Sequence, residues 1–216
     1  MIKRIQALAA VCVVFFAPLA SAQDAKAGET KAAMCIGCHG IPGYQSSFPE
    51  VHRVPMIAGQ NGKFIEASLQ AYKKGERRHP SMRGIAASLS DKDMADLGAF
   101  YEQQGKGIGT PAPEAVPAPS PEVAALLTKG ACASCHGVNY SKPLDPSYPK
   151  LAGQHADYLF VALRSYKAKD LATVGRSNAI MVGQVAQFKP AELKAMANYL
   201  GSLPGDLRTV PQSKFR

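Results

Sequence analysis

The feature that most constrains this chain is the motif C-x-x-C-H, which occurs at residues 35–39 (CIGCH) and again at residues 132–136 (CASCH). This spacing is the attachment sequence of c-type haem, in which two thiols form thioethers and the adjacent histidine becomes an axial ligand of the iron. The sequence therefore predicts two covalently bound haem c groups per chain. The predicted attachment residues are Cys35, Cys38, Cys132 and Cys135, and the predicted proximal ligands are His39 and His136.

Other uses of paired cysteines fit this sequence less well. An exported chain could form disulfides, and C-x-x-C alone could be a redox pair. A zinc site would need further cysteine or histidine ligands at finger-like spacing, and the sequence lacks them. The histidine that directly follows each second cysteine favours haem over all three alternatives.

The N-terminus has the pattern of a secretory signal. Lys3 and Arg4 precede an apolar run of 16 residues, and Ala20-Ser21-Ala22 then forms a small-residue cleavage site. We expect cleavage after Ala22 and export to the periplasm, with Cys12 lost in the removed segment. The alternative is an uncleaved membrane anchor, for which the apolar run is short compared with a span of about 20 residues.

The rest of the chain is a tandem duplication. PMIAGQ at residues 55–60 recurs as PKLAGQ at 149–154, and residues 82–100 are echoed by 181–199. Five prolines within residues 110–121 (TPAPEAVPAPSP) indicate an extended linker between the two copies. We therefore predict an all-α protein with units at residues 23–105 and 122–216, joined by a linker at 106–121.

Apolar spacing and caps predict the main elements of each unit. Residues 24–34 should form a helix that runs into the first haem motif, and residues 61–74 and 90–105 should form two more, the last capped by Ser90. Glycine, proline and basic residues predict loops at 40–54 and 75–83. The first of these loops is longer than its counterpart in the second unit.

The sixth ligand of each haem decides its chemistry, because methionine raises the reduction potential and suits electron transfer. Met82 lies 43 residues after His39 and Met181 lies 45 residues after His136, both in segments predicted as loops. Among the methionines only this pair is matched between the units in distance and context. We predict Met82 and Met181 as the axial methionines.

Three histidines compete with these methionines as distal ligands: His52, His79 and His155. None of them has a histidine counterpart in the other unit. We interpret all three as surface residues and keep His79 as the alternative ligand of the first haem.

The net charge of +9 is unevenly distributed, since residues 23–105 carry +1 and residues 120–216 carry +6. No nucleic-acid-binding motif accompanies this charge, so acidic proteins or anionic membrane surfaces are the expected partners through electrostatic steering.

The densest basic cluster is either a solvated helix end or a docking patch beside the first haem. Its members are Lys73, Lys74, Arg77, Arg78 and Arg83.

The twin C-x-x-C-H motifs, the twin P-x-[IL]-A-G-Q segments and the twin methionine segments resemble the dihaem cytochrome c4 family over nearly the whole chain after residue 22. The resemblance implies two class I cytochrome c domains about a pseudo-twofold axis, with facing haem edges. It also implies that the carbonyls of Pro55 and Pro149 accept hydrogen bonds from the proximal histidines. It suggests a quinol–cytochrome c oxidoreductase as electron donor and a terminal oxidase as acceptor.

Three functions are consistent with these residues. The first is an electron carrier with no catalytic activity of its own. The second is the electron-accepting subunit of a dehydrogenase, such as a sulfide-oxidising flavocytochrome. The third is a dihaem enzyme, such as a peroxidase or thiosulfate dehydrogenase, which would need a reactive distal site. The matched methionines favour the carrier.

Overall fold

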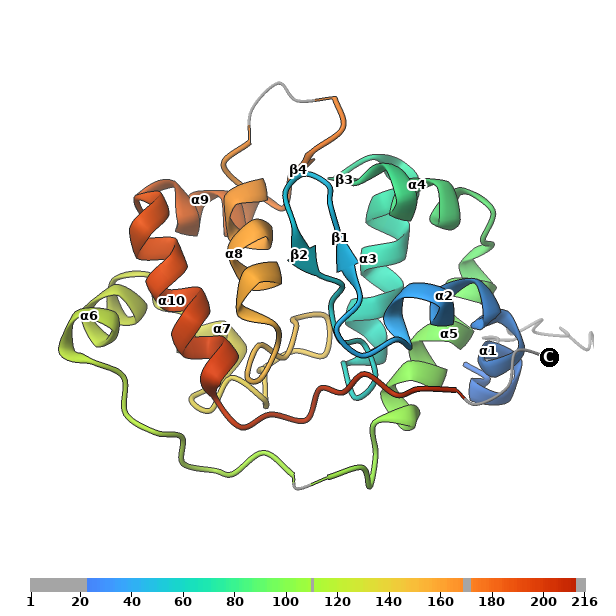
Figure 1. Ribbon diagram of the computed structural model, residues 1–216, viewed down its shortest axis with the longest axis horizontal. Helices are drawn as coiled ribbons and strands as arrows, with labels where there is room; N and C mark the ends of the chain where they lie inside the picture. Colours follow the sequence, from blue (N-terminus) through green and yellow to red (C-terminus); the bar gives the residue numbers. More distant parts are fainter. Residues whose placement is uncertain (1–22, 110, 169–171, 213–216) are drawn as a thin grey trace, which may run out of the picture.

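Two helical halves lie side by side in the computed structural model (Figure 1), which describes residues 23–109, 111–168 and 172–212. The predicted leader at residues 1–22 lies outside the described residues. Helices dominate both halves, and every strand in the described ranges is only two residues long. The predicted all-α fold is therefore confirmed.

The first half packs its helices around one apolar cluster. Met94 and Leu97 of the last helix are 0% and 1% exposed at its centre, together with Ile65 and Leu69. Its elements are α1 (Ala25–Lys31), α2 (Ala33–His39), β1 (Gln45–Ser46), β2 (His52–Arg53), α3 (Gly62–Lys74), β3 (Arg77–Arg78), α4 (Pro80–Ala87) and α5 (Asp91–Gln104).

The second half repeats this arrangement around a cluster of its own. Leu193, Met196 and Leu200 of its last helix are buried there with Leu159. Its elements are α6 (Pro121–Lys129), α7 (Ala133–His136), α8 (Ala156–Ser165), β4 (Gly175–Arg176), α9 (Ala179–Ala186) and α10 (Pro190–Ser202).

Local sequence explains where the long helices begin and end. Ser90 and Asp93 form a reciprocal capping box at the start of α5, which satisfies two backbone N–H groups that the helix leaves unpaired. Gly75 ends α3 in the left-handed conformation, with φ of 80°, which glycine adopts without steric cost. The helices predicted at 61–74 and 90–105 are both present within one residue.

Two of the local predictions were wrong. Residues 75–83 are not all loop, because Pro80 is the first residue of α4, where its missing N–H and fixed φ favour a helix start. The predicted single helix at 24–34 is two helices, α1 and α2, and the second contains the whole haem motif. The N–H of Ala32 is shared between the carbonyls of Gly28 and Glu29, which tightens the last turn of α1.

The longer loop of the first half reaches the second half. Residues 45–53 form the antiparallel β1–β2 hairpin, and Arg53 pairs with Asp157 at 3.0 Å while Glu50 pairs with Arg164 at 2.9 Å. β3 and β4 also pair across the halves, with Arg77 opposite Arg176. The extra length found in the sequence is therefore used to hold the two halves together.

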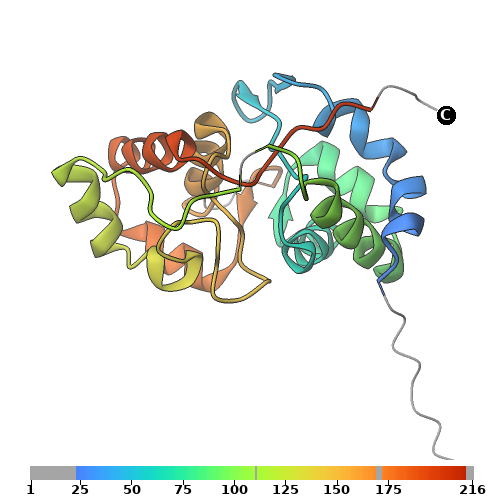
Figure 2. The same ribbon diagram turned by 90° about the horizontal axis from the view of Figure 1, so that it is seen from below.

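Two extended segments cross between the halves on one side of the molecule (Figure 2). One is the proline-rich segment at 111–120. The other follows α10, where the N–H of Arg208 donates to the carbonyl of Ala58 at 3.0 Å and the N–H of Ala112 donates to Asp206. In the described ranges, no helix is long and apolar enough to cross a membrane.

Candidate haem sites and the interface between them

The first haem motif lies on α2, packed against the core of the first half. Cys35 is half-buried and Cys38 is exposed, and the ring of His39 at the end of the helix donates through Nδ1–H to the carbonyl of Pro55 at 2.8 Å. A histidine that donates from Nδ1 keeps its lone pair on Nε2. Burial lowers the pKa of His39 and outweighs the opposing effect of the Pro55 hydrogen bond. The ring is thus held neutral, which is the form that binds iron.

The second motif has the same arrangement on α7. Cys132 and Cys135 are both half-buried, and His136 donates through Nδ1–H to the carbonyl of Pro149 at 3.0 Å. Burial lowers the pKa of His136 as well, again against the effect of its proline hydrogen bond. Both halves therefore hold the histidine by the same contact with a proline carbonyl.

The two matched methionines lie in helices rather than loops. Met82 is in the first turn of α4, and Met181 is in the first turn of α9, where the Asn178 side chain accepts its N–H. Met82 and Cys35 both pack at the edge of the first core, and Met181 and Cys132 both pack at the edge of the second. In each half, one cysteine of the motif and the matched methionine thus pack against the same apolar cluster.

The histidines predicted to be at the surface are partly or wholly covered, so that prediction was wrong. His52 is only 5% exposed, because the β1–β2 hairpin stacks its ring on Tyr158 of the second half, with centroids 6.3 Å apart. His79 is half-buried and donates through Nε2–H to the carbonyl of Phe48 at 3.3 Å. His155 is half-buried at the start of α8. The stacking of His52 on Tyr158 and the hydrogen bond of His79 to Phe48 use these rings at the contact between loop and interface residues, which makes them weaker candidates for an axial ligand.

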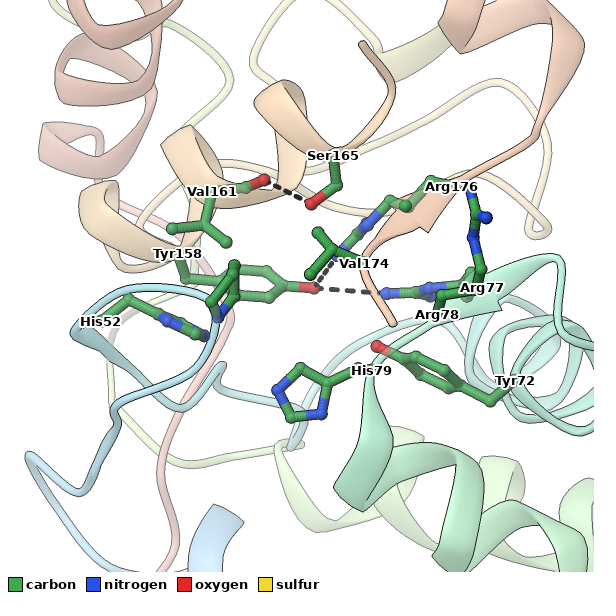
Figure 3. A pocket seen from close by; sticks show the side chains of 12 residues that line it. His52, Tyr72, Arg77, Arg78, His79, Tyr158, Val161, Ser165, Val174 and Arg176 are labelled. Carbon is green, nitrogen blue, oxygen red and sulfur yellow. Dashed lines mark hydrogen bonds between the residues drawn. The ribbon is translucent and has the colours of Figure 1, made fainter. Parts of the chain in front are cut away.

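A cationic pocket lies where the two halves meet (Figure 3). Its cavity of about 40 Å³ is lined from both halves. Arg77 and Arg176 both donate to the hydroxyl of Tyr158, at 3.4 and 3.2 Å, and Figure 3 shows their guanidinium groups converging on it. Arg77 also lies over the ring of Tyr72 at 4.6 Å, and Arg176 over that of Tyr166 at 5.5 Å.

This cluster shifts the acidity of its phenol. Burial opposes ionisation of Tyr158, but the charges of Arg176 and Arg77 and their hydrogen bonds outweigh it and lower the pKa of Tyr158 to about 8. In the described part of the chain neither arginine forms an ion pair with a carboxylate. Both guanidinium groups are half-buried, and two such cations without a carboxylate partner favour a negatively charged group at this site.

The residues present fit two haem c groups. The four cysteines form no disulfide with one another, so every thiol can form a thioether. Arg77 Nε and His79 Nδ1 are buried without a hydrogen-bond partner among the described groups, and they lie three to five residues before Met82. Haem c carries two carboxylates, which can accept from the unpaired N–H of Arg77 Nε. Nδ1 of His79 is the acceptor nitrogen of its ring, because Nε2–H donates to the carbonyl of Phe48.

The five basic residues of the candidate docking patch do not share one environment. Arg77 and Arg78 lie in β3 at the interface between the halves, half-buried. Lys73, Lys74 and Arg83 are exposed, although the ammonium of Lys73 also donates to the carbonyl of Leu89. These last three are the exposed members of the cluster.

Sequence reasoning missed the residues that join the two halves. Gln60 and Gln154 are each 4% exposed and bind backbone groups of the opposite half. The sequence did mark these two glutamines, because each ends a copy of the repeated P-x-x-A-G-Q segment. The repeat does not reveal, however, which other part of the chain each glutamine side chain contacts.

Comparison with known proteins agrees with this arrangement. The cytochrome c family profile matches residues 121–204. Over 200 residues the chain is 31% identical to cytochrome c4 of Azotobacter vinelandii, covering 85% of this chain and 90% of that protein. It is 28% identical over 209 residues to a thiosulfate dehydrogenase electron acceptor of Thiomonas intermedia, covering 94% and 92%. The crystal structure of reduced cytochrome c4 from Pseudomonas stutzeri superimposes with a TM-score of 0.63 at 28% identity, over 85% of this chain and all of that chain.

Proposed function

Because the chain belongs to the dihaem cytochrome c4 family, we propose that it carries single electrons in the periplasm through two haems that are each ligated by histidine and methionine. It is an electron carrier rather than an enzyme, and it holds two covalently attached haem c groups. The bound haems supply the one-electron chemistry, and the chain supplies their attachment, their axial ligands and the surroundings that tune them. The leader pattern at residues 1–22 supports the periplasmic location.

One observation carries the proposed ligation. Each half holds a neutral histidine by a proline carbonyl and brings a half-buried methionine to the edge of the same core as a motif cysteine. Nε2 of His39 and of His136 would provide one ligand of each iron, and Sδ of Met82 and of Met181 would provide the other. Methionine in the sixth position blocks access by substrates and favours electron transfer over oxygen or peroxide chemistry.

The interface residues supply the electrostatic surroundings. Arg77 and Arg176 would receive carboxylates of the haems in the pocket between the halves, with Arg77 Nε as a further donor. These contacts would fix the haems relative to each other and partly compensate the buried cationic charge. Cysteine thioethers then keep the groups attached in domains whose apolar cores are small.

The partners follow from the family and from charge. A quinol–cytochrome c oxidoreductase is the proposed donor and a terminal oxidase the proposed acceptor. The exposed side chains of Lys73, Lys74 and Arg83 beside the Met82 segment support docking to an acidic surface.

A second function is favoured by a specific observation, the full-length similarity to the thiosulfate dehydrogenase electron acceptor. In that case the chain would receive electrons from a dehydrogenase rather than from a quinol-oxidising complex. The haem sites would be the same in both roles. Rates of reduction by a purified thiosulfate dehydrogenase with thiosulfate, and by a purified quinol–cytochrome c oxidoreductase with quinol, would distinguish them.

The near-infrared absorption spectrum of the oxidised holoprotein tests the ligation. Two methionine–iron charge-transfer contributions are expected per chain, and Met82→Ala and Met181→Ala should each remove half of the signal. Met34→Ala is the matched control, since Met34 is 46% exposed beside the first motif, and it should leave the spectrum unchanged. An unchanged spectrum in either of the first two variants would exclude that methionine as a ligand.

A further inference from the structure

Two buried glutamines exchange hydrogen bonds across the interface in a reciprocal pattern. Gln154 accepts the N–H of Met56 at 3.0 Å and donates to the carbonyl of Met56 at 2.8 Å. Gln60 accepts the N–H of Lys150 at 2.9 Å and donates to the carbonyl of Lys150 at 3.0 Å. Met56 and Lys150 occupy equivalent positions of the repeat. Each half therefore binds the other through the same pair of hydrogen bonds, from a glutamine amide to the N–H and the carbonyl of one residue.

In the first half, the peptide unit that Gln154 binds is also the one that orients His39. The peptide unit between Pro55 and Met56 accepts a hydrogen bond from His39 through its carbonyl at 2.8 Å. The N–H of that same peptide unit donates to Gln154 of the second half. A single planar amide therefore connects the histidine of one half to a side chain of the other.

The second half mirrors this connection. The carbonyl of Pro149 accepts from His136 at 3.0 Å, and the N–H on the other side of that peptide, which belongs to Lys150, donates to Gln60. Each glutamine oxygen also accepts the N–H of the residue that follows it, Asn61 or His155, at 3.0 Å. These bonds hold both side-chain amides in one orientation.

An amide transmits the effect of a hydrogen bond from its N–H to its carbonyl. When the N–H donates to a good acceptor, resonance places more negative charge on the oxygen, and consecutive hydrogen bonds strengthen one another. A more basic carbonyl draws the Nδ1 proton more strongly and makes the imidazole a stronger donor to iron. We propose that Gln154 and Gln60 are crossed positioning residues, each of which sets the proximal hydrogen bond, and so the reduction potential, of the haem in the opposite half.

This inference rests on the proposed ligation by His39 and His136. Its consequence is directional, because a weaker proximal hydrogen bond makes the histidine a weaker donor and favours the reduced iron. Loss of Gln154 should raise the potential of the first haem, and loss of Gln60 should raise that of the second. A residue that only supported its own half would act on its own haem instead.

The test is to measure both potentials of the holoprotein in Gln154→Leu and in Gln60→Leu by spectroelectrochemistry, with haem methyl NMR signals assigning each potential to its haem. We expect an upward shift of the first haem alone in Gln154→Leu and of the second alone in Gln60→Leu. Gln154→Met and Gln60→Met, unbranched and of similar length, serve if the leucine variants fold poorly. Asn61→Ala is the matched control. Asn61 Nδ2 also donates across the interface, to the carbonyl of Tyr148 at 2.9 Å, but it does not bind the peptide unit whose carbonyl accepts from His136.

Three results would overturn the inference. The glutamine variants could leave both potentials unshifted, or shift only the haem in the half that contains the replaced glutamine. They could also shift both haems equally, with Asn61→Ala giving the same shift. The unsubstituted holoprotein separates this result from a failure of the proposed function. If its spectrum lacks the two methionine–iron contributions, the ligation itself is wrong. If the contributions are present and the shifts are not crossed, only the role of the glutamines fails.

Discussion

Arg77 and Arg176 are direct partners in the antiparallel β3–β4 pair, and both donate to the hydroxyl of Tyr158. Arg77 lies five residues before Met82, and Arg176 lies five residues before Met181. The segments that lead into the two proposed axial methionines are therefore hydrogen-bonded to each other. Movement of one distal segment is restrained by the other through this pair.

Tyr158→Phe tests how much the shared hydroxyl contributes to stability. Both half-buried guanidinium groups lose an acceptor at the interface between the halves, so the free energy of unfolding of the holoprotein should fall by about 1–3 kcal/mol. Denaturant titration measures the change. Tyr44→Phe removes a hydroxyl from a residue that is 42% exposed and should alter stability by less than about 0.5 kcal/mol. Equal effects of the two substitutions would contradict a special role for Tyr158.

Asp96 should make the stability of the first half sensitive to acid. Its side chain is 0% exposed, and it accepts from Lys31, from Lys92 and from the N–H of Asp24. Burial opposes its ionisation, but these donors outweigh it and lower the pKa of Asp96 to about 2, from 3.8. Because the folded-state pKa lies below the unfolded one, this stabilisation is complete at neutral pH and is lost as the pH falls from about 5 towards 2.

Asp96→Asn should accordingly lower the free energy of unfolding by about 1–3 kcal/mol at pH 7, where a charged acceptor is replaced by a neutral one. The difference from the unsubstituted protein should shrink below pH 4 and disappear only as the pH falls below about 2, the folded-state pKa. Asp91→Asn, in the exposed first turn of α5, is the control. A difference that stays constant across this pH range would show that the charge of Asp96 does not account for its effect.

The exposed basic residues should govern encounter with an acidic redox partner. Lys74→Glu and Arg83→Glu should each lower the second-order rate of electron transfer several-fold at low ionic strength, with the loss disappearing as added salt screens the charges. Stopped-flow mixing at several salt concentrations measures this. Lys194→Glu makes the same charge change on α10 of the other half and should have a smaller effect. A rate that does not depend on salt would exclude docking through these charges.

Local chemistry made much of this protein predictable from its sequence. The haem motifs, the helix from Ser90 to Gly105 and the duplication follow from residue types at short spacings, because thioether attachment, capping and turns depend on near neighbours. The equivalence of Met82 and Met181 also followed, since it needed only comparison of the two copies. The helical start at Pro80 was read as a loop because proline signals either a turn or a helix N-terminus.

What only the tertiary structure decided is how one copy faces the other. The C-x-x-C-H motifs by themselves determined the cofactor and its number, and they predicted its proximal ligands. They could not place Gln154 on the peptide that orients His39, nor bury His52 against Tyr158, nor bring Arg77 beside Arg176. These contacts join residues about 100 positions apart. They depend on the relative orientation of two folded halves, which apolar periodicity and local spacing do not encode.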